Sequence, residues 1–198
     1  NFGSADIWLK KNIEGAELVP VVIGKEANFD IAMVENKLFI RTNLDAPRFM
    51  VYVADMEKPG FDDWQVFLPE SEDKLEGLSF IDGHIYAEYL SGIETVIKIY
   101  DLDGTFIRNM TLPASFCSAG VSGYWHKGPV KLNCSSYLIP NTTYAYNVDD
   151  DKLTVLKEFP VKYELDNCAV TQVFYPSKDG TKIPMTIIYP KDRPRDGS

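Results

Sequence analysis

The sequence predicts an all-β fold: a partial β-propeller of about 3.5 four-stranded antiparallel blades, followed by a β-hairpin. Two observations predict it. Apolar stretches are short and alternate with a period of two, and none keeps the 3.6-residue period of an amphipathic helix between two caps. In addition, two sequence marks recur at an interval that matches one propeller blade, which is roughly 40–50 residues long.

The first mark is an apolar stretch that ends in an aspartate. It occurs at Asp55, Asp101 and Asp149, with spacings of 46 and 48 residues. The second mark is a proline that follows another apolar stretch, with spacings of 44 to 49 residues, at Pro20, Pro69, Pro113 and Pro160. Because two independent marks share one period, we interpret residues 1–160 as an incomplete propeller and residues 161–198 as a linker and hairpin.

The strands follow from the alternation within each repeat. The first blade is expected to be a half-blade, with one strand near residues 5–9 and a second approaching Leu18. The next three blades are expected to have four strands each, at 29–34, 37–42, 48–55 and 64–68, then 75–81, 85–89, 95–100 and 105–112, then 117–125, 131–137, 142–147 and 152–159. Turn-forming residues separate them, at Glu35-Asn36, Asp82-Gly83, Asp103-Gly104 and Asp149–Asp151.

Residues 169–190 predict the hairpin. β-Branched and aromatic residues alternate from Val170 to Tyr175, Asp179-Gly180 offers the positive φ of a tight turn, and a second strand returns from Lys182. The pattern itself indicates only a hairpin. However, its stretch F-Y-P-S-K-D-G-T-K-I-P-M closely resembles the start of the peptidase domain in the prolyl oligopeptidase family of serine peptidases. The stretch T-N-L-D-A-P also resembles that family and departs from it at Leu44, where relatives can carry a basic residue.

This resemblance implies a function. In that family a seven-bladed propeller precedes an α/β-hydrolase domain, and a Ser-Asp-His triad cleaves short peptides after proline while the propeller keeps folded proteins out. The chain would be a fragment that holds later blades and the entry to the hydrolase domain. Its implied partners are the hydrolase domain of the parent chain and short peptides. No triad residue falls within it, so we expect no catalytic residue and no activity from this chain alone.

Propeller topology predicts which loops face the hydrolase domain. Loops that join the second and third strands of a blade share a face with the links between blades, and a domain attached after Pro160 would cover that face. The candidate interdomain or substrate-facing residues are therefore Asn43, Asp45, Pro47, Ser91, Pro140 and Asn141. Each taken alone could be an ordinary polar turn residue, but loops on a rigid scaffold commonly carry contacts.

Two alternatives stay open. The chain could be a stand-alone propeller-type module that binds a protein or a glycan, although the hairpin argues against a ring that closes on itself. It could also be a self-assembling interaction scaffold, because an open array of blades leaves two apolar faces bare. We expect such bare faces either to associate with each other or to be covered by a partner.

Several classes of function are not supported. A net charge of −9 and a pI near 4.7 argue against nucleic acid and anionic membranes as partners. No apolar run approaches the roughly 20 residues of a membrane span. Three sequons, at Asn109, Asn133 and Asn141, are weak indicators of secretion, and the sequence leaves the compartment open between cytoplasm and periplasm.

Catalytic and metal motifs are also missing from the sequence. Gly120–Tyr124 approaches the G-x-S-x-G elbow of serine hydrolases but lacks the final glycine. His84 and His126 are expected to be turn residues, and Asp101 begins a stretch like a calcium loop whose last ligand position holds Leu112. We therefore expect no metal and no cofactor.

The three cysteines, Cys117, Cys134 and Cys168, are expected to be free and mostly buried. A hairpin centred near Lys127-Gly128 would place Cys134 opposite about Val121. In that register a bridge from Cys134 to Cys117 would need a shift of the strands.

Overall fold

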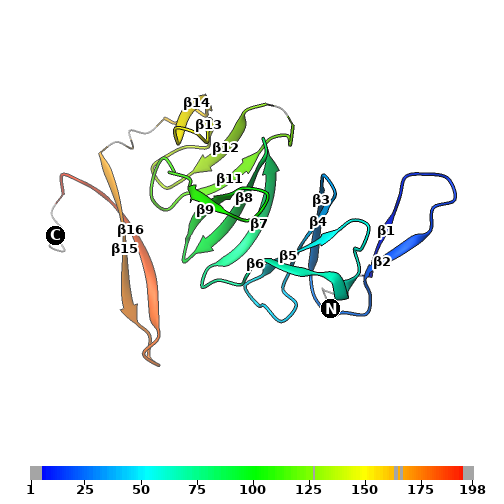
Figure 1. The fold of residues 1–198 in the computed structure, drawn as a ribbon. Coiled ribbons are helices and arrows are strands. Elements are labelled where there is room, and N and C mark those ends of the chain that lie inside the picture. Colours follow the sequence, from blue (N-terminus) through cyan, green and yellow to red (C-terminus); the bar gives the residue numbers. More distant parts are fainter. Residues whose placement is uncertain (1–5, 127, 163–164, 166, 194–198) are drawn as a thin grey trace. The chain divides into compact units, whose positions relative to one another are not determined.

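The computed structural model describes residues 6–126, 128–162, 165 and 167–193. These residues form strands and one short 3₁₀ helix, η1 (Phe61–Asp63) (Figure 1). The strands of the first half are β1 (Ile7–Lys10), β2 (Leu18–Val22), β3 (Phe29–Val34), β4 (Lys37–Thr42), β5 (Met50–Asp55), β6 (Gln65–Leu68), β7 (Lys74–Ile81) and β8 (His84–Ser91). The others are β9 (Glu94–Tyr100), β10 (Phe106–Asn109), β11 (Ser118–Ser122), β12 (Val130–Ser135), β13 (Thr142–Asn147), β14 (Lys152–Glu158), β15 (Cys168–Pro176) and β16 (Lys182–Pro190).

The sheets have the predicted order. In the described residues, β1 and β2 pair alone, three four-stranded sheets follow as β3–β6, β7–β10 and β11–β14, and β15 pairs with β16. Every pairing is antiparallel and joins strands that are neighbours in sequence. The predicted fold class, about 3.5 propeller blades followed by a hairpin, is confirmed.

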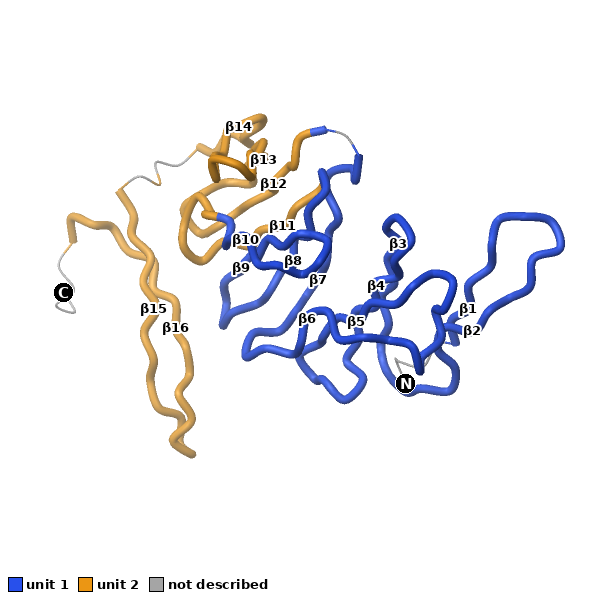
Figure 2. Tube along the Cα trace, in the orientation of Figure 1, with its two compact units in different colours: residues 1–110, 123–128 blue, residues 111–122, 129–198 orange. Residues whose placement is uncertain are grey.

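The chain divides into two compact units (Figure 2). The first contains residues 1–110 and 123–128, and the second contains residues 111–122 and 129–198. The first unit therefore holds the sheets of β1–β2, β3–β6 and β7–β10. The second holds the sheet β11–β14 and the hairpin β15–β16.

Within the first unit, consecutive sheets pack face to face through strand β4. All residues of β4 after Lys37 are buried. Leu38 and Ile40 belong to the core shared with β1 and β2, whereas Phe39 belongs to the core shared with β7 and β8. Because successive side chains on a strand point to opposite faces, this one strand supplies two cores. Such stacking of neighbouring sheets is what a propeller requires.

The core between the sheets β3–β6 and β7–β10 is rich in aromatic residues. The Phe39 ring lies 4.8 Å from the ring of Phe80 and 5.1 Å from that of Phe67, centroid to centroid. Burial raises the pKa of Tyr89 in the same core well above its usual range. This phenol therefore stays protonated at any pH at which the protein would be handled, and contributes as an apolar ring.

Strand β11 is shorter than the sequence predicts. The expected strand at 117–125 is observed as Ser118–Ser122, because the residues that follow belong to the other compact unit. There the Tyr124 carbonyl accepts a 3.1 Å hydrogen bond from the Asp82 N–H, and Trp125 packs against the core of Phe39. Tertiary contacts thus override the β propensity of Tyr124 and Trp125. Ala5, at the start of a predicted strand, and Lys127, in the predicted turn between the strands at 117–125 and 131–137, lie outside the described residues.

The predicted hairpin at 169–190 is observed, with Phe174 opposite Pro184 and Val170 opposite Ile188. Its loop is closed by a hydrogen bond from the Ser177 N–H to the Thr181 carbonyl at 2.8 Å. Gly180 has φ +85°, which a glycine adopts without the steric cost of a Cβ. The Asp179 carboxylate accepts the Thr181 N–H at 3.0 Å, and that bond lowers the pKa of Asp179.

The predicted register of Cys134 was wrong. Cys134 faces Ala119, and Val121 faces Leu132, so the pairing is shifted by two residues from the expectation. As a result Cys134 comes close to Cys117, and the two side chains hydrogen-bond. All three thiols are free in the structure, with Cys117 and Cys134 buried and Cys168 half-buried. The hydrogen bond to Cys117 and burial both raise the pKa of Cys134.

This arrangement predicts the order in which the thiols react. Only a thiolate attacks an alkylating reagent. A raised pKa keeps Cys134 protonated near pH 8.5, where an unperturbed thiol is about half ionised, and burial shields both Cys117 and Cys134. We expect iodoacetamide to modify Cys168 first, and the other two only after denaturation, as measured by mass spectrometry of peptides. Early modification of Cys134 in the folded protein would contradict the observed register and burial.

Candidate functional site

The loop between β4 and β5 contains three of the predicted site residues, Asn43, Asp45 and Pro47. Its two ends bond to the links between consecutive sheets. The Asn43 Oδ1 accepts the N–H of Asn28, before β3, at 2.7 Å, and the Arg48 N–H donates to Glu70 Oε1, after β6, at 2.6 Å. The structure therefore places this loop beside the links between sheets, as the topological argument assumes. Its role toward a further domain stays a prediction.

The loop is held in shape by its own hydrogen bonds. The N–H of Ala46 donates to the Asn43 carbonyl at 3.2 Å, and the N–H of Phe49 donates to the Ala46 carbonyl at 2.8 Å. Ala46 is buried while Asp45 and Pro47 are exposed. Asp45 has φ +55°, a conformation that aspartate tolerates better than most residues. The loop thus presents Asp45 and Pro47 outward from a fixed backbone.

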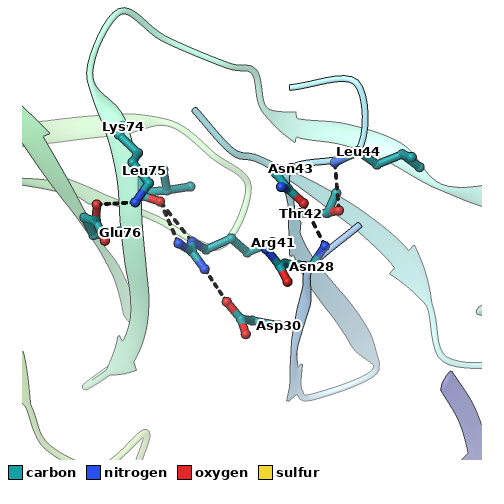
Figure 3. A network of polar contacts seen from close by, with 9 residues as sticks. All are labelled: Asn28, Asp30, Arg41, Thr42, Asn43, Leu44, Lys74, Leu75 and Glu76. Carbon is teal, nitrogen blue, oxygen red and sulfur yellow. Dashed lines mark hydrogen bonds and ion pairs between the residues drawn. The ribbon is translucent and has the colours of Figure 1, made fainter. Parts of the chain in front are cut away.

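Below the loop, Arg41 on β4 carries a buried charge (Figure 3). Its side chain is 10% exposed. The Nε and Nη2 atoms both donate to the Leu75 carbonyl, at 3.1 and 2.8 Å, and Nη1 pairs with the carboxylate of Asp30. A guanidinium remains charged at every ordinary pH, so it needs these partners when it leaves water.

An aromatic ring covers the same guanidinium. The centroid of Phe49 lies 3.9 Å from Arg41 Cζ, and Lys74 Nζ lies 5.8 Å from that centroid. Phe49 has φ +66°, which is rare for a bulky residue and costs of order 1–3 kcal/mol. Contacts with the cation and with the core around Phe39 offset this strain. Phe49 therefore ties the end of the loop to Arg41.

Ser91, the fourth candidate, lies at the same end of the next sheet. It is the last residue of β8 and faces Glu94 across a turn of two residues, in which Gly92 has φ +64°. Its neighbour Leu90 pairs with Lys74, at the start of β7. The Leu75 N–H in turn donates to the Arg48 carbonyl at 2.9 Å. The structure thus brings the Ser91 turn and the loop to one end of their two sheets.

Pro140 and Asn141 belong to the second unit and are described within it. The Thr142 hydroxyl donates to the Pro140 carbonyl at 2.8 Å, and the Phe159 N–H donates to the Asn141 carbonyl at 3.2 Å. The main chain at both positions is therefore fixed inside its own sheet. The side chain of Asn141 is exposed.

The stretches that approach a catalytic or metal-binding motif occupy ordinary structural positions. Ser122 ends strand β11, and His84 Nδ1 lies 2.8 Å from the Asp82 carbonyl in a turn. Asp101 accepts the N–H groups of Thr105 and Asp103 at 2.8 and 2.9 Å, and these bonds lower the pKa of Asp101. Within the described ranges, no cluster of three or more His, Cys, Asp or Glu residues could hold a metal ion. The same part of the chain contains no helix that is long and apolar enough to cross a membrane.

Comparison with known proteins gives the family. The model of the prolyl oligopeptidase N-terminal β-propeller domain matches residues 2–159. The chain belongs to this family. The predicted resemblance is therefore confirmed, and the alternative of an unrelated stand-alone binding module is not favoured.

Individual relatives support the same family. The prolyl endopeptidase of Elizabethkingia meningoseptica is 28% identical over 193 residues, which are 97% of this chain and 27% of the relative. The prolyl endopeptidase of Dictyostelium discoideum is 29% identical over 168 residues, 79% of this chain and 22% of that enzyme. The chain thus spans about a quarter of the length of these curated relatives.

Solved structures share the fold. One comes from a study of two prolyl endopeptidases and the role of inter-domain dynamics in catalysis and specificity. The match to this structure has a TM-score of 0.86 and 27% identity, and it covers 98% of this chain and 29% of the solved chain. The apo form of prolyl oligopeptidase B from Galerina marginata has a TM-score of 0.85, 26% identity and the same coverage. A variant of the Galerina enzyme has also been solved with a 35-residue hydrolysis and macrocyclization substrate.

Arg41 gives a prediction for stability. Replacing it in Arg41→Met keeps most of the apolar stem but leaves the Leu75 carbonyl without its buried donors, which costs roughly 1–3 kcal/mol. The control is Arg48→Met, which removes an exposed side chain and keeps the main-chain bonds of residue 48. We expect the free energy of unfolding, measured in urea, to fall for Arg41→Met and to stay nearly constant for Arg48→Met. An equal loss in both variants would show that Arg41 does not fasten the two sheets.

Proposed function

We propose that this chain is the substrate-gating propeller portion of a serine peptidase that cleaves short peptides after proline. The observation that carries the proposal is the family match over residues 2–159, together with relatives that are prolyl endopeptidases. Residues 161–198 then form the linker and the first hairpin of the peptidase domain. The likeness of F-Y-P-S-K-D-G-T-K-I-P-M to the start of that domain supports this division.

The loops named above are, in this proposal, the face that meets the hydrolase domain. Asn43, Asp45 and Pro47 would contact it from one sheet and Ser91 from the next, with Pro140 and Asn141 contributing from the last. The rigidity of the β4–β5 loop supports such a role, because residues that bind or orient a partner are commonly carried on loops with a fixed backbone.

A chromogenic peptide with proline before the scissile bond tests the activity. Because the chain contains no G-x-S-x-G elbow, we expect the 198 residues alone to release no chromophore. We expect the longest product of the same reading frame to release it, and a serine-directed inhibitor to stop that release. Inhibitor-sensitive activity in the 198-residue chain would refute this placement, and an inert long product would refute the proposed function.

Exposed apolar side chains support a further part of the proposal, that the ends of the array are covered in the working protein. Trp8 and Leu18, on β1 and β2, are 49% and 60% exposed, and Val155 and Leu156, on β14, are 56% and 53% exposed. Scattered apolar residues are normal on a surface, but runs of them on terminal sheets mark contact sites. Because the relatives are about four times longer, further residues of a longer chain are the preferred cover.

This predicts that the 198-residue chain associates with itself when nothing else covers these residues. We expect its mass by sedimentation equilibrium to rise with concentration, and the double variant Leu18→Lys, Leu156→Lys to weaken the rise. A matched control, Glu17→Lys with Lys157→Glu, changes charges at neighbouring exposed positions without removing apolar surface. A monomer at all concentrations would contradict the prediction.

A further inference from the structure

A small cavity of about 230 Å³ lies next to Arg41 in the first unit. Its polar lining comes from Asp30 and Arg41, and its apolar lining includes Ile31, Phe39 and Leu78. β3 and β7, which contribute to its walls, are each the edge strand of their sheet. The volume is far above the roughly 10–15 Å³ that one water molecule needs. The cavity can therefore admit a group much larger than water at the edges of two sheets.

Arg41 has hydrogen-bonding capacity left for such a group. A guanidinium has five N–H groups. Three are used in the structure, two toward the Leu75 carbonyl and one toward Asp30. Arg41 as a whole is 8% exposed, so a ligand would reach the other two mainly from the cavity that Arg41 lines. Among the described residues no further acceptor is bonded to them, and buried donors are almost always bonded in proteins.

Asp30 supplies the complementary acceptor. Its Oδ2 pairs with Arg41, and its side chain is 67% exposed at the mouth of the cavity. The other carboxylate oxygen has no hydrogen bond to a described residue. Donor and acceptor thus stand side by side, and the charges of the pair cancel. A free anion would meet the carboxylate of Asp30, and a free cation would meet the guanidinium of Arg41.

We propose that the Arg41–Asp30 cavity is a subsite for the backbone of an extended, uncharged peptide segment. The peptide carbonyl accepts from the Arg41 guanidinium, the next peptide N–H donates to Asp30, and a small apolar side chain lies against Phe39 and Leu78. β3 and β7 are edge strands, and an extended peptide is a ligand that commonly binds along a sheet edge. This goes beyond the proposed function, because such a subsite binds a peptide whether or not the parent protein cleaves it.

The test measures binding and not hydrolysis. The probe is N-acetyl-Ala-Pro-Ala-amide, which has peptide groups and no charge, titrated into the 198-residue chain by isothermal calorimetry. We expect Asp30→Asn to weaken binding about tenfold, because the amide nitrogen that replaces one carboxylate oxygen cannot accept a hydrogen bond. Because this replacement also removes the charge that pairs with the buried Arg41, we expect a lower thermal midpoint, and binding is compared at a temperature at which both proteins are folded. The matched control is Asp62→Asn, an exposed acid of η1, which should bind as the parent chain does.

A second probe separates peptide recognition from simple attraction of anions. The free acid of the same peptide should bind more weakly than the amide, because its carboxylate is repelled by Asp30. Tighter binding of the acid would overturn the proposal in favour of an anion site at Arg41. Absence of amide binding, or equal binding by the parent chain and Asp30→Asn, would also overturn it. None of these results depends on prolyl peptidase activity, so the two proposals fail separately.

Discussion

Leu75 has both of its main-chain polar groups bonded to the preceding sheet, and this contact fixes how two blades meet. Its carbonyl accepts from Arg41, and its N–H donates to the Arg48 carbonyl. β7 is an edge strand, so on that side these groups have no partner in their own sheet. Apolar packing between two sheets is non-directional, whereas hydrogen bonds are specific in direction and distance. The bonds at Leu75 therefore define the relative register of the two sheets.

Burying the guanidinium of Arg41 also costs free energy, which its surroundings offset. Removing a guanidinium from water is unfavourable unless it is paired and hydrogen-bonded. Asp30 pairs with it, Leu75 accepts two hydrogen bonds, and Phe49 covers its face. Phe49 in turn adopts a strained backbone that only a well-fixed surrounding maintains. The charge, the ring and the loop consequently depend on each other.

The sequence predicts the large features because they repeat or are local. The period of the Asp and Pro marks defines the blades, and Asp179-Gly180 predicts the hairpin. The sequence does not predict contacts between residues that are distant along the chain. The predicted register of Cys134 was wrong because β11 ends already at Ser122, and Trp125 beyond it packs against another core. A strand register depends on such tertiary contacts, and a shift of two residues keeps the same side chains inward, so alternation could not detect it.

Polar contacts between segments that are distant in sequence were missed for a similar reason. From the sequence, Arg41 is expected to be an exposed basic residue of a strand. Its partner, the carbonyl of Leu75, is 34 residues away, so no neighbouring residue indicates the contact. Asp151 was assigned to a turn, which is observed, but its carboxylate also accepts bonds from the Thr111 and Tyr146 hydroxyls at 2.6 and 2.8 Å. Thr111 is 40 residues distant. In both cases one polar side chain completes bonds to a segment that only the fold brings near.

The position of Arg41 connects the two surfaces for which functions are proposed. On one side its guanidinium is covered by Phe49, whose N–H bond to Ala46 fixes the end of the β4–β5 loop. On the other side it lines the cavity at whose mouth Asp30 lies. A ligand that draws the guanidinium toward the cavity must alter its contact with Phe49, or its bonds to Leu75, or both. A peptide bound there would thus lie one side chain, that of Arg41, away from Phe49 and the end of the β4–β5 loop.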